Sequence, residues 1–260
     1  MRWEQFYNPK EMPIGERQQK DELELEQYRA FHEVYEPILD KLIGQMRSEI
    51  ESNRYAAVIG DDRSGRLPAM AVHGIMANVA RDYDTVPPKM FFIHHPKMPL
   101  PGPKGLDQRV EDIKNSIGEN RVLVVTDYIE TGSTLRKIIT YLEFHKIPFD
   151  VAALSRKSLG TIIKFDEKKQ MPKDSKLFLG EDNSDKGLIF WTRMRSDERM
   201  PDHIKRNDTG LVKSEHDAIA QIDSRADRAL VTSARELNNE IAHKLYEKYF
   251  RNDELNKQDA

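Results

Sequence analysis

The stretch Asp127–Thr134 (DYIETGST) gathers polar side chains around a glycine, directly after an apolar run. Gly132 lets the backbone turn tightly and approach a ligand closely. Three hydroxyl groups stand beside backbone N–H groups at a predicted helix start, those of Thr131, Ser133 and Thr134. Such N–H groups and the helix dipole bind anions, whereas a carboxylate such as Asp127 suits ribose hydroxyls or a hydrated Mg²⁺. The same residue types also cap ordinary strand-to-helix turns, so an anion site and a plain turn both remain open.

The elements around this stretch alternate between strands and helices. Short apolar runs predict strands at 55–59, 90–93, 121–125 and 149–154. Helices are predicted from Leu67, with Pro68 in the first turn, and over 135–142. The strand runs are continuously apolar, which is typical of a parallel sheet buried on both faces. The fold class is therefore α/β.

Both ends of the chain show a helical pattern. Apolar residues recur at steps of three and four over 28–46 and again over 219–249, and Ser214–Asp217 forms a possible capping box. Pro37 is expected to divide the first pattern into two helices, because it removes a donor and restricts the residue before it. We divide the chain into a helical extension (1–53), an α/β domain (54–193) and a C-terminal linker with a helical extension (194–260).

A second polar loop, Gly60–Arg66 (GDDRSGR), follows the first predicted strand. Ligands of open parallel sheets bind beyond the carboxyl ends of the strands, and this loop and 127–134 both lie there. Taken alone, the loop is also compatible with a surface turn that carries scattered charges. The choice between a ligand-binding loop and a surface turn depends on the stretch at 122–134.

The string Val122–Thr134 resembles the signature of the type I phosphoribosyltransferases: four apolar residues, two acids, two apolar residues, a variable position and Thr-Gly-x-Thr. The resemblance implies that Thr131, Gly132, Ser133 and Thr134 hold the 5′-phosphate of phosphoribosyl pyrophosphate (PRPP), and that Asp127 binds its ribose. One position departs from the signature. Thr126 replaces the first acid, which leaves Asp127 as the remaining carboxylate of the pair.

The loop Gly60–Arg66 resembles the pyrophosphate loop of the same family. The resemblance implies that the pyrophosphate of PRPP lies on Arg63, Ser64, Gly65 and Arg66. The two loops are separated by a helix and a strand, which is the order that the family would show. Two acids, Asp61 and Asp62, are less expected there and suit a pyrophosphate mainly through an intervening Mg²⁺.

Glu130 occupies the variable position of the signature, where purine-salvage members carry an acid that accepts a proton from the base. The resemblance therefore makes Glu130 and Asp127 the candidate catalytic residues and Asp127 the candidate ligand of the cofactor Mg²⁺. A solvated glutamate in the first helical turn is the other interpretation of Glu130.

Two further segments match positions of functional loops in the family. The Pro- and Gly-rich stretch 94–105 corresponds to a mobile loop that covers PRPP, although it is also compatible with a long connection. Segments 176–180 and 188–191 are candidates for a hood over the base, with Phe178 or Trp191 stacking on it. Such aromatic side chains also commonly belong to the core.

Composition limits the remaining function classes. The chain of 260 residues carries 41 basic and 44 acidic residues, a net charge of −3, and shows no basic stripe that predicts nucleic-acid binding. Cysteine is absent, which excludes disulfides, thiolate catalysis and zinc sites built on cysteine. No apolar run approaches the roughly 20 residues of a membrane span. We expect a cytoplasmic protein.

These observations predict a parallel-sheet, phosphoribosyltransferase-like core with helical N- and C-terminal extensions. The expected function is Mg²⁺-dependent transfer of ribose 5-phosphate from PRPP to a nucleobase such as a purine, with release of pyrophosphate. The alternative is a nucleotide-binding regulatory or assembly protein of the same fold without transferase activity. The expected partners are PRPP, a small-molecule base and a further copy of the chain.

Overall fold

The computed structural model describes residues 27–61, 65–93, 106–118, 120–129, 132–157, 171–183 and 228–251, the single residues 22, 25 and 166, and two short strands at 211–212 and 221–222. The main strands are β1 (Tyr55–Asp61), β2 (Lys89–Ile93), β3 (Arg121–Ile129), β4 (Phe149–Lys157) and β5 (Leu177–Asn183). The helices are η3 (Ala30–Tyr35), α2 (Glu36–Glu51), α3 (Arg66–Asp82), α4 (Leu106–Ile117), α5 (Ser133–Phe144), α9 (Arg228–Tyr246) and η4 (Glu247–Arg251).

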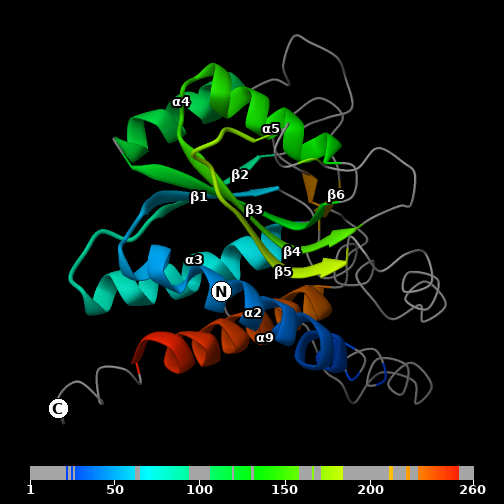
Figure 1. The fold of residues 1–260 in the computed structure, drawn as a ribbon. Helices are drawn as coiled ribbons and strands as arrows, with labels where there is room; N and C mark the ends of the chain where they lie inside the picture. Colours follow the sequence, from blue (N-terminus) through cyan, green and yellow to red (C-terminus); the bar gives the residue numbers. More distant parts are fainter. Residues whose placement is uncertain are drawn as a thin grey trace, which may run out of the picture.

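The five main strands form one sheet in the order β2-β1-β3-β4-β5, and every neighbouring pair is parallel. The prediction of an α/β fold with a parallel sheet is confirmed (Figure 1). A separate antiparallel pair, β6 (Leu211–Val212) and β7 (Gln221–Ile222), lies outside this sheet. Because all five strands run in one direction, their carboxyl ends lie along one edge.

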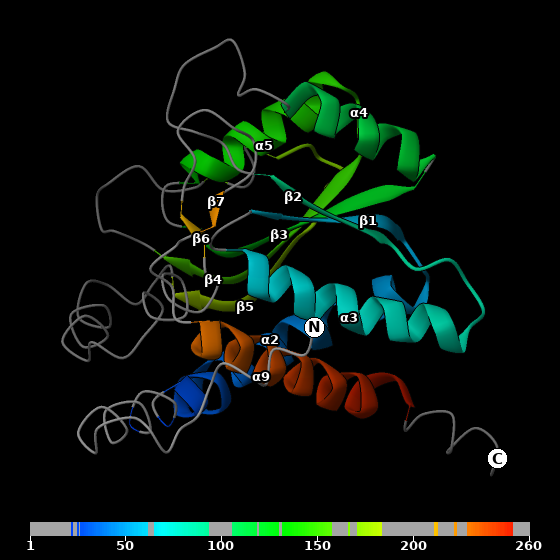
Figure 2. The ribbon, with the colours of Figure 1, turned by 180° about the vertical axis from the view of Figure 1, so that it is seen from behind.

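Side chains of the central strands alternate between two hydrophobic clusters, as the period of two requires. On β3, Val122 and Val124 belong to one cluster and Leu123 and Val125 to the other. Helices α4 and α5 cover the first face, whereas α2 and α3 cover the second (Figures 1 and 2). Burial on both faces explains why these strands read as continuous apolar runs.

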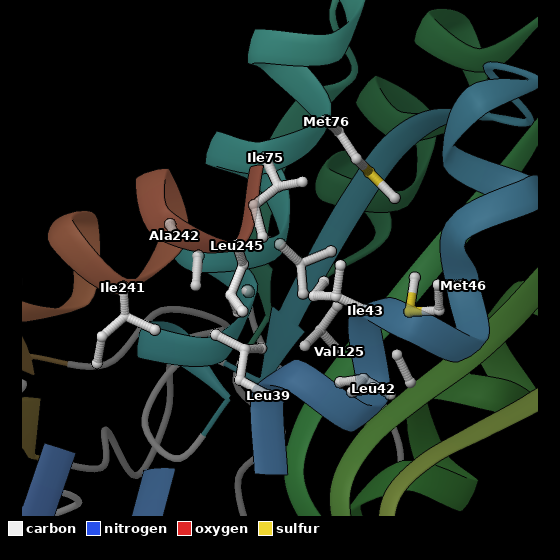
Figure 3. Close-up of a cluster of buried hydrophobic side chains, with 14 of the residues drawn as sticks. Leu39, Leu42, Ile43, Met46, Ile75, Met76, Val125, Ile241, Ala242 and Leu245 are labelled. Atoms are coloured by element: carbon white, nitrogen blue, oxygen red, sulfur yellow. The ribbon is translucent and has the colours of Figure 1, made fainter. Parts of the chain in front are cut away.

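The helices from the two ends of the chain pack together on the second face. α2 lies against β5, and α9 packs along α3 with further contacts to α2 and η3. Figure 3 shows side chains of α2, α3, α9 and β3 meeting in this cluster, among them Leu39, Ile75, Ile241 and Val125. The terminal helices are therefore part of the main core, and α9 forms an additional layer outside α2 and α3 (Figure 2).

The expected helix break at Pro37 is wrong. Glu36 keeps helical dihedrals (φ −56°, ψ −49°), and its N–H donates to the carbonyl of Phe31, five residues back. The π-helical segment η3 therefore runs directly into α2, and the wider π-helical turn before Pro37 accommodates a residue without a backbone donor.

The C-terminal helix begins later than its pattern predicted. Ile222 belongs to strand β7, so the apolar spacing at 219–222 does not mark a helix. The described helix α9 starts at Arg228, and Ser214–Asp217 lies outside the described residues. Among the described helices, none has the length and apolar character needed to cross a membrane.

Residues 176–180 do not form a hood. Leu177–Asn183 is the fifth strand of the main sheet and pairs with β4. Phe178 is buried in the second-face cluster, so the core interpretation of this aromatic is the correct one. Trp191 lies outside the described residues.

Candidate functional site

Two helices begin at the carboxyl edge of the sheet, and each has a glycine at its N-cap. Gly65 precedes α3 and Gly132 precedes α5. A glycine cannot cap the first N–H groups with a side chain, and neither first turn contains an acidic residue. At both helix N-termini the first backbone N–H groups and the positive end of the helix dipole therefore meet no carboxylate from the first turn. Such a helix N-terminus favours the binding of an anion.

Gly132 adopts the left-handed conformation, with φ 68° and ψ 14°. Residues with a Cβ rarely adopt this conformation, so this position before α5 strongly favours glycine. Ser133 and Thr134 lie in the first turn of α5, exposed and half-buried respectively. This is the position that the resemblance assigned to the phosphate-binding hydroxyls.

The loop after β1 lies directly against the end of β3. A Cβ atom on Gly65 would be 2.5 Å from the carbonyl oxygen of Val125 and 3.1 Å from Cα of Thr126. The loop is closed by a 2.9 Å hydrogen bond from the Gly65 N–H to the Asp61 carbonyl. The structure thus brings Gly65 close to the backbone of Val125 and Thr126, next to Asp127 on β3.

The sequence predicted that Asp127 lies in a loop, but the structure places it in β3. The strand continues to Ile129, because its pairing with β4 extends as far as Arg156. Asp127 is 8% exposed and Thr126 is 7% exposed. The Thr126 hydroxyl lies 3.5 Å from Oδ1 of Asp127, so the residue that replaces the first acid of the signature directly neighbours the second.

Arg66 is the first residue of α3, beside this strand edge. Its guanidinium carbon lies 4.1 Å from the ring centroid of Phe92, near the end of β2. Such a distance is typical of a cation–π contact, which attracts the guanidinium to the ring face. The structure therefore places a cation, a buried carboxylate and two helix N-termini along the ends of β1, β2 and β3.

Several predicted site residues lie outside the described residues. These are Arg63, Ser64, Glu130 and Thr131, together with the stretch 94–105. Of the other predicted residues, Gly65 and Arg66 lie at the start of α3, Asp127 lies on β3, and Gly132, Ser133 and Thr134 lie at the start of α5.

The described residues fit Mg²⁺ only as an ion shared with a ligand. Among them, no three histidine, aspartate or glutamate side chains converge on a metal position. Mg²⁺ commonly uses one or two carboxylates, keeps several waters and takes its other ligands from substrate phosphates. The Asp127 carboxylate at the carboxyl edge is suited to that arrangement, and it does not form a dedicated all-protein site.

A buried polar cluster at the opposite, amino edge of the sheet was not predicted. Asp150, at the start of β4, is fully buried. It accepts hydrogen bonds from Arg54 Nε (3.0 Å), the Tyr55 hydroxyl (2.9 Å), Arg121 Nη2 (3.2 Å) and the Lys176 N–H (2.8 Å). Burial and the Asp150 carboxylate raise the pKa of Tyr55. Its members stand at or next to the starts of strands, so the cluster links β1, β3, β4 and β5 through side-chain hydrogen bonds at this edge.

No family model matches the chain, and no curated protein is similar to it. Among solved structures, it resembles the purine phosphoribosyltransferase of Pyrococcus horikoshii OT3 with a TM-score of 0.33 and 18% identity over 54% of this chain and 82% of that one. It also resembles the orotate phosphoribosyltransferase of Aeropyrum pernix with a TM-score of 0.35 and 19% identity over 62% and 76%.

A third similar structure is a hypothetical protein of Neisseria gonorrhoeae with bound ppGpp. Its TM-score is 0.36 at 18% identity, and the match covers 62% of this chain and 91% of that one. All three scores and identities are low. The fold is defined by the strand order β2-β1-β3-β4-β5 and its parallel register.

Proposed function

We propose that the protein is a Mg²⁺-dependent phosphoribosyltransferase that moves ribose 5-phosphate from PRPP to a nitrogen of a nucleobase and releases pyrophosphate. The observation that carries the proposal is the contact of Gly65 with the end of β3. Through this contact the start of α3 lies beside Thr126, the residue before Asp127, and α5 begins at Ser133, after the end of the same strand. PRPP has the matching chemistry, because a phosphate and a diphosphate flank its ribose hydroxyls.

In this proposal each group at the carboxyl edge of the sheet binds a different part of PRPP. The N-terminus of α5, with Ser133 and Thr134, holds the 5′-phosphate, and Asp127 accepts hydrogen bonds from the ribose hydroxyls. The pyrophosphate lies by Gly65 and Arg66. When bound, Mg²⁺ neutralises charge on the diphosphate oxygens.

The reaction is a substitution at C1 of the ribose. The base nitrogen forms a bond to C1, while the bond from C1 to the pyrophosphate oxygen breaks and its electron pair leaves with pyrophosphate. The nitrogen loses its proton to a general base, for which Glu130 is the candidate by its place in the sequence. The carboxylate of Asp127 favours the positive charge that develops on the ribose, and the two helix starts hold the 5′-phosphate and the diphosphate of PRPP in position.

The experiment is an assay of pyrophosphate release from PRPP with Mg²⁺ and a panel of nucleobases. The proposal expects release that depends on one or more bases and is strongly reduced in Asp127→Asn. Release that is unchanged in this variant would reject the assigned site.

A specific observation favours a second function, nucleotide binding without transfer. Thr126 replaces an acid of the signature, and its hydroxyl lies beside the Asp127 carboxylate. A neutral hydroxyl stabilises a cationic transition state less than a carboxylate does. Tight binding of PRPP or a nucleoside monophosphate by calorimetry, without pyrophosphate release with any base, would support this regulatory alternative.

A further inference from the structure

The ring of Phe92 occupies space that a glycine leaves open. Phe92 is the register partner of Gly60 in the parallel pair β1·β2. A Cβ atom on Gly60 would lie 2.9 Å from Cδ1 and Cε1 of Phe92 and 2.9 Å from Cβ of Ala69. The ring therefore packs over the Gly60 backbone and next to the first turns of α3. Any side chain at position 60 would displace it.

This packing places the ring under the Arg66 guanidinium, whose carbon lies 4.1 Å from the ring centroid. Arg66 is the first residue of α3, where the helix dipole disfavours a cation. Attraction to the ring face offsets part of this cost, and the planar guanidinium suits such a contact better than an ammonium group does. An anion bound next to the guanidinium would offset the remainder.

We propose that Phe92 is a positioning residue, which holds the Arg66 guanidinium at the carboxyl edge of the sheet where it meets the diphosphate group of the ligand. This inference rests on the proposed function and deepens it, because it names a residue outside both predicted loops. Phe92 does not touch the ligand and acts through Arg66. Its removal leaves the charge of Arg66 in place but allows the side chain to leave the edge.

The test uses inorganic pyrophosphate with Mg²⁺, titrated into the full chain in a calorimeter. Phe92→Leu keeps an apolar side chain but removes the ring face, and we expect about five- to tenfold weaker binding. Phe92→Tyr keeps the ring face and should bind like the wild type. The matched control is Phe91→Leu, since Phe91 stands next to Phe92 on β2 but packs against the opposite cluster. This control should leave pyrophosphate affinity unchanged.

A double-mutant cycle separates positioning from a merely structural role. In an Arg66→Lys background the stacked guanidinium is already lost, so Phe92→Leu should weaken binding by less than about twofold more. In a PRPP assay, Phe92→Leu should raise the KM for PRPP more than it lowers kcat. Thermal unfolding of each variant checks that it remains folded.

The outcomes distinguish this inference from the proposed function. Wild-type affinity in Phe92→Leu, or an equal loss in the Arg66→Lys background, would overturn the positioning role and leave the proposed function intact. If the wild type binds neither pyrophosphate nor PRPP, both are overturned. Weaker binding in Phe92→Leu alone, with recovery in Phe92→Tyr, supports the inference.

Discussion

Substituting Gly65 by alanine tests the close approach of Gly65 to β3. The added methyl group would meet three backbone atoms: the carbonyl oxygen of Val125 at 2.5 Å, the nitrogen of Asp61 at 2.9 Å and Cα of Thr126 at 3.1 Å. Backbone atoms cannot rotate away as a flexible side chain can. The φ of Gly65 is −86°, a value that alanine adopts freely, so the effect of the substitution is purely steric.

The expected cost follows from overpacking. The loop must move away from β3 by several tenths of an ångström, and forced shifts of this kind typically cost about 1–3 kcal/mol of unfolding free energy. The same movement separates the α3 N-terminus and Arg66 from Asp127. Loss of one charge-assisted hydrogen bond to a ligand is worth roughly 1.5–3 kcal/mol, so PRPP affinity should fall by about one to two decades.

The assay is chemical denaturation together with calorimetric titration of PRPP and Mg²⁺. The matched control is Gly74→Ala in the same helix, where an added Cβ would meet nothing within 4 Å. Alanine should stabilise that site by about 0.5–1 kcal/mol and leave binding unchanged. If Gly65→Ala has the stability and the PRPP affinity of the wild type, the two loops do not form one site.

Three further variants, one of them a double substitution, test separate parts of the structure. Asp127→Asn should weaken PRPP binding by one to two decades, about 1.5–3 kcal/mol, without loss of the fold; calorimetry and circular dichroism measure the two effects. Gly132→Val forces a β-branched residue to a φ of 68°, and should abolish the ligand-induced rise in melting temperature. Leu237→Asp combined with Ile241→Asp places two charges in the core and should cause aggregation, seen by light scattering, whereas the exposed control Asn239→Asp should not. Sedimentation of the wild type should show at least a dimer, and a monomer would reject the expected oligomer.

The strand-and-helix order was predictable because burial on both faces leaves an unambiguous pattern. Runs such as Val122–Val125 are apolar at every position, since both neighbouring clusters require apolar side chains. The pattern failed where a strand carries polar residues: Thr126 and Asp127 read as the start of a loop, although pairing with β4 keeps them in β3. Polar residues at a strand end identify a candidate site better than they identify the end of the strand.

The remaining differences between the sequence prediction and the structure arise from long-range contacts, which the spacing of residue types along the chain does not reveal. The Asp150 cluster requires Arg54, Arg121 and Asp150 to meet, and only the register of β1, β3 and β4 brings them together. The sequence predicts Phe92 only as part of a strand, and its packing over Gly60 follows from the register of β1 and β2. Pro37 was read as a break, since local rules do not anticipate a π-helical turn that accommodates it.

The most direct test of the central claim is an experimental structure of the chain with a bound nucleoside 5′-monophosphate. We expect the phosphate within hydrogen-bond distance of the backbone N–H groups at the start of α5, and the ribose hydroxyls at the carboxylate of Asp127. The side of the ribose to which pyrophosphate is attached in PRPP should face Gly65 and Arg66. A nucleotide bound at any other edge or face of the sheet, or a phosphate remote from Ser133 and Thr134, would contradict the proposed site.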